Sequence, residues 1–166
     1  MLLQASNIIG KPIYSQQDDQ EMGRVADIII DPKNGDVVAF LISELWQKPK
    51  IVSEQDVIDV NQSGVLINAA ESIMAPAEII KVDEIMKRKI KLIGSKVITE
   101  SKQKLGVAED FVIETSTGQI IKLYVKNGLL SPSLILPTDK IVNIEKNLVI
   151  FSDDVLNPES AMPQVA

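Results

Sequence analysis

The chain has 166 residues, of which 45% are hydrophobic and 24% charged, proportions typical of a folded globular protein rather than a disordered one. Its formal net charge of −6 argues against a protein that binds a polyanion over its whole surface, although a local basic patch stays open. It contains no His and no Cys, which excludes Ser-His-Asp and Cys-His nucleophilic sites, the usual zinc sites, iron–sulfur clusters, His- or Cys-ligated haem, and disulfides.

The beginning of the chain does not look like a targeting segment. Residues 1–10 lack the basic start and the long apolar stretch of a signal peptide. No apolar run approaches the roughly 20 residues that a membrane-spanning helix needs. We therefore expect a soluble, cytoplasmic protein without a membrane span.

An internal repeat organises the chain. Residues 23–42 match residues 106–125 at an offset of 83, and both glycines that punctuate the predicted strands recur. The identical positions are Gly23/Gly106, Asp27/Asp110, Ile30/Ile113 and Gly35/Gly118. Further matches are Ile9-Gly10 with Ile93-Gly94 and Asp56 with Asp139. The two units run from about 8 to 70 and from about 92 to 155.

Each unit predicts a small β-barrel. Short runs rich in Ile and Val alternate with turn residues, a pattern typical of strands. Residues 31–36 and 114–119 are predicted hairpin turns, in which Gly35 and Gly118 supply the positive φ. Short strands at this spacing favour a small closed barrel, because closure removes exposed strand edges.

The alternation of the second strand in each hairpin predicts which side chains face the core. Lys122 must face water, which places its neighbours on the opposite face. The predicted inward residues are Ile121, Leu123, Val125 and, by the repeat, Val38, Phe40 and Ile42. The outer face keeps Ile29, Val37 and Leu41, and is too apolar to be fully wet. We expect the other barrel, the linker or another subunit to cover it.

The segment between the units predicts a helix over about 77–89. It begins near Pro76, carries acids early and bases late, and places four apolar residues on one helical stripe. The stripe is Ile79, Val82, Met86 and Ile90. It should pack on a barrel.

These elements together predict an all-β protein of two tandem small antiparallel β-barrels joined by a short helical linker. The expected organisation is a first barrel over 1–70, a linker over 71–91, a second barrel over 92–155, and a mobile tail over 156–166. The tail holds Pro158 and Pro163 and no periodic apolar pattern.

The repeated pattern resembles the PRC-barrel family. Each unit has an Ile-Gly opening, a Leu/Met-Gly-x-x-x-Asp strand, a Gly-containing hairpin, and a Ser/Pro-led segment with Asp and Ile. In the first unit these pieces are Ile9-Gly10, Met22-Gly23 to Asp27, Gly35 and Ser53 to Ile58. In the second they are Ile93-Gly94, Leu105-Gly106 to Asp110, Gly118 and Pro137 to Ile141.

This resemblance implies a non-catalytic docking module built on a small antiparallel barrel. The family includes the cytoplasmic domain of the photosynthetic reaction centre H subunit and the C-terminal domain of the ribosome maturation factor. This chain lacks the membrane helix of the former, and both of its units resemble PRC units, unlike the N-terminal barrel of the latter. Neither member's partner carries over.

The recurring Asp27 and Asp110 have a functional and a structural interpretation. A paired-carboxylate site needs two acids about 5–10 Å apart, whereas a single Asp at a strand bend accepts backbone N–H bonds. We favour the structural role. No phosphate-binding glycine loop occurs, and nothing pairs acids, bases or nucleophiles at an informative spacing. We therefore expect no catalytic residues, no metal site, no cofactor and no enzymatic activity.

The strongest charge feature is a basic segment over residues 81–104. Its eight basic and three acidic side chains give it a local charge of +5 in a chain of −6. The candidate basic patch is Lys87, Arg88, Lys89 and Lys91. Such a patch can bind RNA, but Asp83–Lys87 and Glu84–Arg88 are at the i,i+4 spacing of ion pairs, and base-stacking aromatics are missing. An ion-paired surface helix is favoured, and nucleic-acid binding is the alternative.

Matching loops carry a pair of large apolar residues in each unit. The pairs are Leu45-Trp46 and Leu129-Leu130, 84 residues apart. Each pair is either a lid over the end of its own barrel, which we favour because apolar loop residues are more often buried, or an anchor for a partner protein. The resemblance favours a protein–protein adaptor with an unidentified protein partner, and the basic segment makes an RNA- or ribosome-associated factor the alternative. Self-association stays open.

Overall fold

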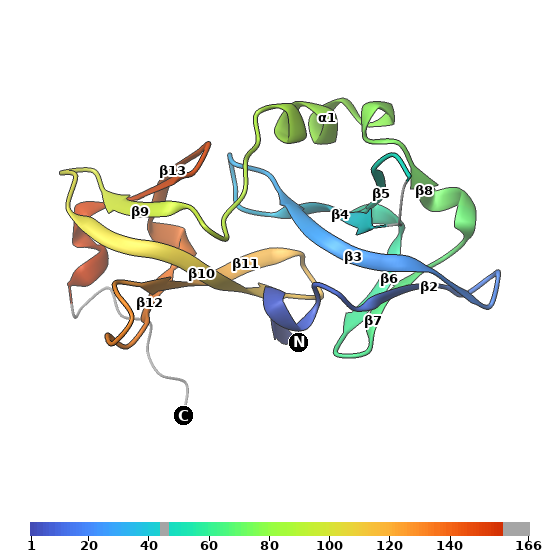
Figure 1. The fold of residues 1–166 in the computed structure, drawn as a ribbon, viewed down its shortest axis with the longest axis horizontal. Helices are drawn as coiled ribbons and strands as arrows, with labels where there is room; N and C mark the ends of the chain where they lie inside the picture. The colour runs from blue at the N-terminus through green and yellow to red at the C-terminus, as the bar shows by residue number, and fades with distance from the viewer. Residues whose placement is uncertain (44–46, 158–166) are drawn as a thin grey trace.

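The computed structural model describes residues 1–43 and 47–157, which are mostly strands (Figure 1). The first sheet has the strand order β6-β7-β2-β3-β4-β5-β8. Its strands are β2 Pro12–Ser15, β3 Gln20–Ile30, β4 Val37–Ser43, β5 Lys50–Ser53, β6 Val57–Asn61, β7 Gly64–Ile67 and β8 Ile73–Met74. Most of the predicted tail, from residue 158, lies outside the described residues.

The second sheet repeats this arrangement with the order β12-β11-β10-β9-β14-β13, and β1 also pairs with β10. Its strands are β1 Leu2–Gln4, β9 Lys96–Thr99, β10 Lys104–Glu114, β11 Gln119–Lys126, β12 Leu134–Pro137, β13 Ile141–Glu145 and β14 Leu148–Phe151. One α-helix, α1 Ile80–Lys87, lies between the units in the described part of the chain. The 3₁₀ turns are η1 Ala5–Asn7, η2 Glu54–Asp56, η3 Ala70–Ser72, η4 Pro76–Glu78, η5 Thr138–Lys140 and η6 Asp153–Leu156.

The predicted all-β tandem fold is confirmed. Both sheets curl into half-barrels, and neighbouring strands are antiparallel except for one parallel pair in each sheet, β2 with β7 and β9 with β14. The recurrence of the parallel pair at the same place shows that the two units share one topology. The predicted boundaries at 70/71, 91/92 and 155/156 stay a prediction.

The offset between the units changes along the chain, which corrects one of the predicted matches. The loop between β11 and β12 is one residue longer than the loop between β4 and β5. From that loop onward the offset is therefore 84, as the bounds of η2 and η5 show. Asp56 consequently corresponds to Lys140, and its predicted match with Asp139 is wrong.

A β-bulge in each hairpin changes the predicted alternation of side chains. The register skips Val38 in β4 and Ile121 in β11. Phe40, Ile42, Leu123 and Val125 are buried as predicted, but Val38 and Ile121 are only partly buried. The residues before the bulge, Val37 and Ile120, are buried instead. An extra residue on one strand shifts the pleat by one position, so strict alternation fails beyond it.

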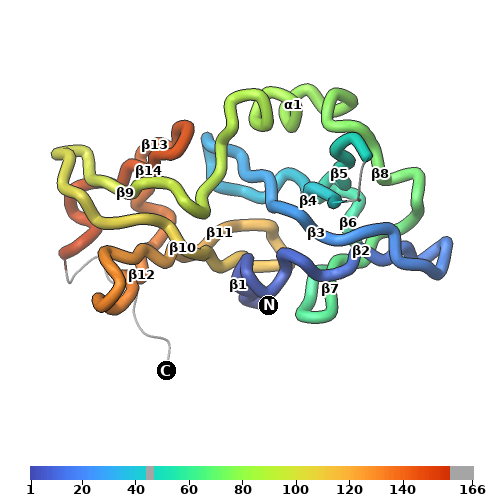
Figure 2. Tube along the Cα trace, in the orientation of Figure 1, coloured from blue at the N-terminus to red at the C-terminus, as the bar shows by residue number. Residues whose placement is uncertain are grey.

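The two units exchange segments and share a core. Residues at the hairpin ends form a bridge between the sheets, Asp36 with Gln119, and the Val37 N–H donates to the Gly118 carbonyl at 2.8 Å. Strand β1 leaves the first unit and pairs with the C-terminal half of β10 (Figure 2). Buried side chains from both units and from α1 form one continuous hydrophobic cluster. The two units therefore do not form separate hydrophobic cores.

Helix α1 covers the outer face of the first sheet, as Figure 1 shows. Within the predicted stripe Val82 and Ile90 are buried and Ile79 and Met86 pack against the core, and Ile85 joins them. The helix is shorter than predicted because Ile79 is extended and Lys89 has a positive φ of 53°. The linker thus covers part of the apolar face, and the hairpin of the second unit covers Val37.

An ion pair fastens α1 to the first hairpin. The Lys81 ammonium lies 2.6 Å from the Asp31 carboxylate, which is buried. Burial alone would raise the pKa of Asp31, but the contact with Lys81 and the N–H of Lys33 outweigh it and hold the pKa below its ordinary value. Asp31 therefore stays ionised and keeps the helix attached at neutral pH.

The repeated glycines are held by different constraints, which predicts unequal costs of substitution. Gly106 has a φ of +138°, and a Cβ built there lies 2.3 Å from the Lys126 carbonyl oxygen. Gly35 has a φ of +76° with no atom within 4 Å of a built Cβ. In urea denaturation Gly35→Ala should cost about 1–2 kcal/mol, the penalty of a left-handed residue. Gly106→Ala should cost at least about 2 kcal/mol more, because β10 and β11 must separate. Equal losses would contradict the register of this hairpin.

Candidate functional site

The apolar pair of the second unit is exposed. Leu129 and Leu130 have relative exposures of 92% and 101%, on the loop between β11 and β12. The loop contains Gly128, with a φ of +85°, and at its far end the Ser133 hydroxyl donates to the Glu109 carboxylate. A lid over the barrel would be buried, so this pair is not a lid. The first pair, Leu45 and Trp46, lies outside the described residues.

Strand β12, which follows this loop, adds two exposed apolar side chains that point to opposite faces of the sheet. Leu134 and Ile135 are also exposed, and among the described strands β12 pairs only with β11 and so forms an edge of the sheet. We call Leu129, Leu130, Leu134 and Ile135 the loop–edge surface. The equivalent strand of the first unit, β5, has its outer edge covered by β8. Sequence reasoning missed Ile135, because its exposure depends on what lies over the sheet.

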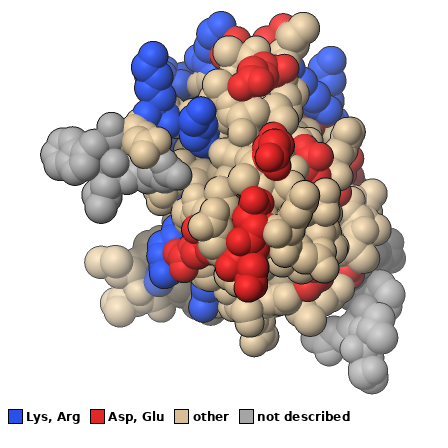
Figure 3. Space-filling view, turned by 90° about the vertical axis from the view of Figure 1, so that its right-hand side faces the viewer, with Lys and Arg blue, Asp and Glu red and all other residues tan. Residues whose placement is uncertain are grey.

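The basic segment is only partly ion-paired. The predicted pair Asp83–Lys87 forms, at 2.6 Å, whereas Glu84–Arg88 is not among the ion pairs of the described residues. The hydrogen bond from Lys87 to Asp83 raises the pKa of the Lys87 ammonium. Figure 3 shows basic side chains mainly along the upper edge of the molecule and acidic ones across its middle.

Two of the predicted patch residues that have no ion pair in the described part of the chain lie around one hollow, whereas Arg88 lines another beside Lys81 and Asp31. Lys89 and Lys91 line a cavity of about 370 Å³ together with Lys146 from the turn between β13 and β14. The sequence held no signal for Lys146, since only the topology brings that turn to the end of α1. This cluster is the basic patch that the structure assembles.

The two repeated aspartates have structural contacts. The Asp110 Oδ1 atom accepts the N–H of Phe111 at 2.9 Å and that of Ser6 at 3.1 Å, and Oδ2 accepts the Ser6 hydroxyl at 2.5 Å. Asp27 accepts the N–H of Ile28 at 2.8 Å. Both sit beside the first bulge of their hairpin, where the ladder is interrupted. Each carboxylate thus satisfies backbone donors, and Asp110 also anchors the exchanged N-terminal segment.

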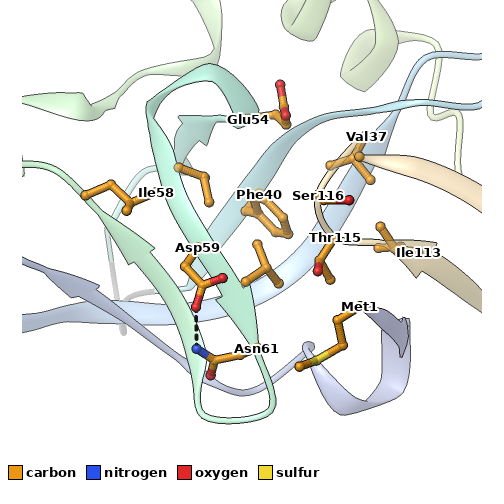
Figure 4. Close-up of a pocket in the computed structure, with 13 residues that line it drawn as sticks. Met1, Val37, Phe40, Glu54, Ile58, Asp59, Asn61, Ile113, Thr115 and Ser116 are labelled. Atoms are coloured by element: carbon orange, nitrogen blue, oxygen red, sulfur yellow. Dashed lines mark hydrogen bonds between the residues drawn. The ribbon is translucent and has the colours of Figure 1, made fainter.

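A cavity of about 580 Å³ lies between the units (Figure 4). Figure 4 shows Phe40 and Val37 of the first unit facing Ile113 and Thr115 of the second. Its polar lining includes Glu54, Asp59, Asn61, Thr115 and Ser116, and Asn61 donates to Asp59 at 2.7 Å. The reciprocal cavity, under the first hairpin, is only about 60 Å³. The larger one has the volume of a small-molecule pocket.

One hydroxyl of the cavity lining has a carboxylate partner. The Ser116 hydroxyl donates to Glu114 at 2.9 Å, but the Met1 ammonium also contacts that carboxylate at 2.5 Å. These contacts lower the pKa of Glu114, which makes it a poor general base for the hydroxyl. The pair stabilises the hairpin turn and fixes the N-terminus against it.

The comparisons place these features in a family. The model of the PRC-barrel domain matches the chain twice, over residues 2–74 and 85–156. A search of curated proteins found no match. Residues 1–43 and 47–157 contain no helix long and apolar enough to cross a membrane and no group of three potential metal ligands. PRC-barrel domains are protein-interaction modules and are generally not catalytic. The two matches span most of the chain, which therefore belongs to the PRC-barrel family as a tandem of two PRC-barrel domains.

Proposed function

We propose that this chain is a non-catalytic, cytoplasmic docking module that binds a partner protein through the loop–edge surface. The observation that carries the proposal is the complete exposure of Leu129 and Leu130 beside the open strand β12. Burying one Leu side chain contributes about 1.5–3 kcal/mol. Two adjacent leucines held away from the core are therefore costly to leave in water and useful at an interface.

The surroundings of the pair also suit docking. A polar rim of Asn127, Ser131 and Ser133 flanks the leucines, and the bond between Ser133 and Glu109 ties the loop to β10. Interfaces combine an apolar centre with a polar rim in this way. By the repeat, Leu45 and Trp46 are a second candidate anchor, in the matching loop of the first unit.

The double variant Leu129→Ser/Leu130→Ser tests this function. Its melting temperature should stay within about 2 °C of the wild type, because the side chains make no core contacts. Capture of the partner from source cells, followed by mass spectrometry, should be lost, and in the wild type it should survive high salt. The matched control is Ile80→Ser, which removes another exposed aliphatic side chain, on α1. Unchanged capture by the double variant would contradict the proposal.

A second candidate function rests on the basic cluster. Lys89, Lys91 and Lys146 line one hollow and have no ion pair among the described residues. Clustered unpaired bases are what a phosphate-rich partner such as RNA contacts. No described aromatic side chain lines this hollow, so base stacking does not add to it, and we favour protein docking.

Charge reversal separates the two functions. Arg88→Glu, Lys89→Glu and Lys91→Glu together remove the unpaired bases of the linker and leave the pair of Lys87 with Asp83 intact. Under the favoured function this variant captures the same protein partner as the wild type at 50 and 200 mM salt. RNA that co-purifies with the wild type, falls steeply with salt and is lost in the variant would instead support the RNA-associated function.

A further inference from the structure

In the first unit, the outer face of the sheet is the face that packs against the linker helix α1. A row of residues crosses the strands from Asp27 on β3 to Leu41 on β4, Ile51 on β5 and Met74 on β8. Asp27 and Leu41 line one cavity with Ile85, Met86 and Ile90 of the linker, so the apolar side of α1 faces this row. Ile51 has a relative exposure of 0%. The covered state of the face therefore includes an amphipathic helix.

The second unit repeats the row without the helix. Its residues are Asp110 on β10, Tyr124 on β11 and Ile135 on β12. The N-terminal segment reaches the Asp110 end through Ser6, but no described helix lies over the other end. Ile135, the counterpart of Ile51, is 56% exposed, and Val107 on the same sheet is exposed as well. Leu41 and its counterpart Tyr124 are both partly buried, so the two faces differ at the outer strand, where Ile51 is covered and Ile135 is exposed.

The charges of the open face differ from those of the covered one. Lys122, Tyr124 and Lys126 alternate along β11, which places both lysines on the side of the tyrosine. Their counterparts on β4 are Ala39 and Ser43. Neither lysine has an ion pair among the described residues. An occupant of this face therefore needs apolar side chains for Tyr124 and Ile135 and negative charge for the lysines.

A second copy of this chain does not supply such a helix. Its α1 is already seated on its own first sheet, with Val82 and Ile85 buried and Lys81 paired to Asp31. The helix and its C-terminal flank also carry Lys87, Arg88, Lys89 and Lys91, the wrong sign for a face with two free lysines. The open face consequently fits a helix from another protein.

We propose that the outer face of the second unit, formed by Val107, Tyr124 and Ile135 between Lys122 and Lys126, binds an acidic amphipathic helix of a partner protein. The helix takes the position that α1 takes on the first unit, with its apolar stripe on Tyr124 and Ile135 and its carboxylates beside the two lysines. An apolar face here recognises the apolar side of an amphipathic helix, and charge complementarity sets the choice of helix. The inference rests on the proposed docking function and names the partner's chemistry.

The probe for this site derives from α1 itself. It is a synthetic peptide of residues 76–91 in which Lys81, Lys87, Arg88, Lys89 and Lys91 are all replaced by Glu. Titrated into the isotope-labelled full-length protein, it should bind with a Kd below about 1 mM, about −4 kcal/mol, and shift the amide signals of Tyr124 and Ile135. The native, basic peptide is the matched control and should bind at least tenfold more weakly. The protein variant Lys122→Glu/Lys126→Glu should reverse this preference.

Several outcomes would overturn the proposal. Absence of shifts at Tyr124 and Ile135 with millimolar acidic peptide would show that the face does not accept such a helix. Binding that appears only after removal of residues 158–166 would make the chain's own tail the occupant. A dimer in sedimentation that Ile135→Lys dissociates would make a second copy the occupant. If the peptide fails while the leucine-dependent capture succeeds, the docking function stands and only its helical partner is refuted.

Discussion

The long hairpin of a PRC-barrel unit is apolar on both faces, and covering its second face is the constraint on which the rest of this structure depends. One face closes on the unit's own core. The other must be covered from elsewhere, because exposed Ile, Leu and Val cost free energy in water. The chain meets this need by exchange: α1 covers the first sheet, and the N-terminal segment, held by Ser6 on Asp110, covers part of the second.

Much of the fold followed from local sequence. The repeat, the hairpin turns and the linker helix depend on spacing and on residue types, and Gly35 and Gly118 have the positive φ that the turns require. The bulges at Val38 and Ile121 did not follow, because a bulge is a property of two paired strands rather than of one. The exchange of β1 onto β10 was likewise hidden, since no local pattern in Leu2–Gln4 distinguishes one sheet from the other.

The candidate site could be predicted only in part, because the sequence shows the repeat but not the tertiary packing. Leu129 and Leu130 stood out because the repeat placed an apolar pair in both loops. Whether such a pair is buried or exposed depends on tertiary packing, and only the structure shows that it is exposed. Ile135 and Lys146 belong to ordinary strand and turn patterns. Their roles depend on tertiary packing, which leaves Ile135 exposed and brings Lys146 beside Lys89 and Lys91. The difference between the units, with Ile51 covered and Ile135 exposed, links the fold to the proposed docking function.

The most direct test of this difference is the reactivity of a thiol at the two equivalent positions. The natural chain has no Cys, so the single variants Ile51→Cys and Ile135→Cys each report one site. In the folded, free protein we predict that the thiol at 135 reacts with a maleimide or an aromatic disulfide within about tenfold of the rate of a free thiol. The thiol at 51, on the buried strand between β4 and β8, should react at least about 100-fold more slowly, since reaction there needs local opening. Equal rates at the two positions would contradict the account, because they would mean that both faces are covered or both are open.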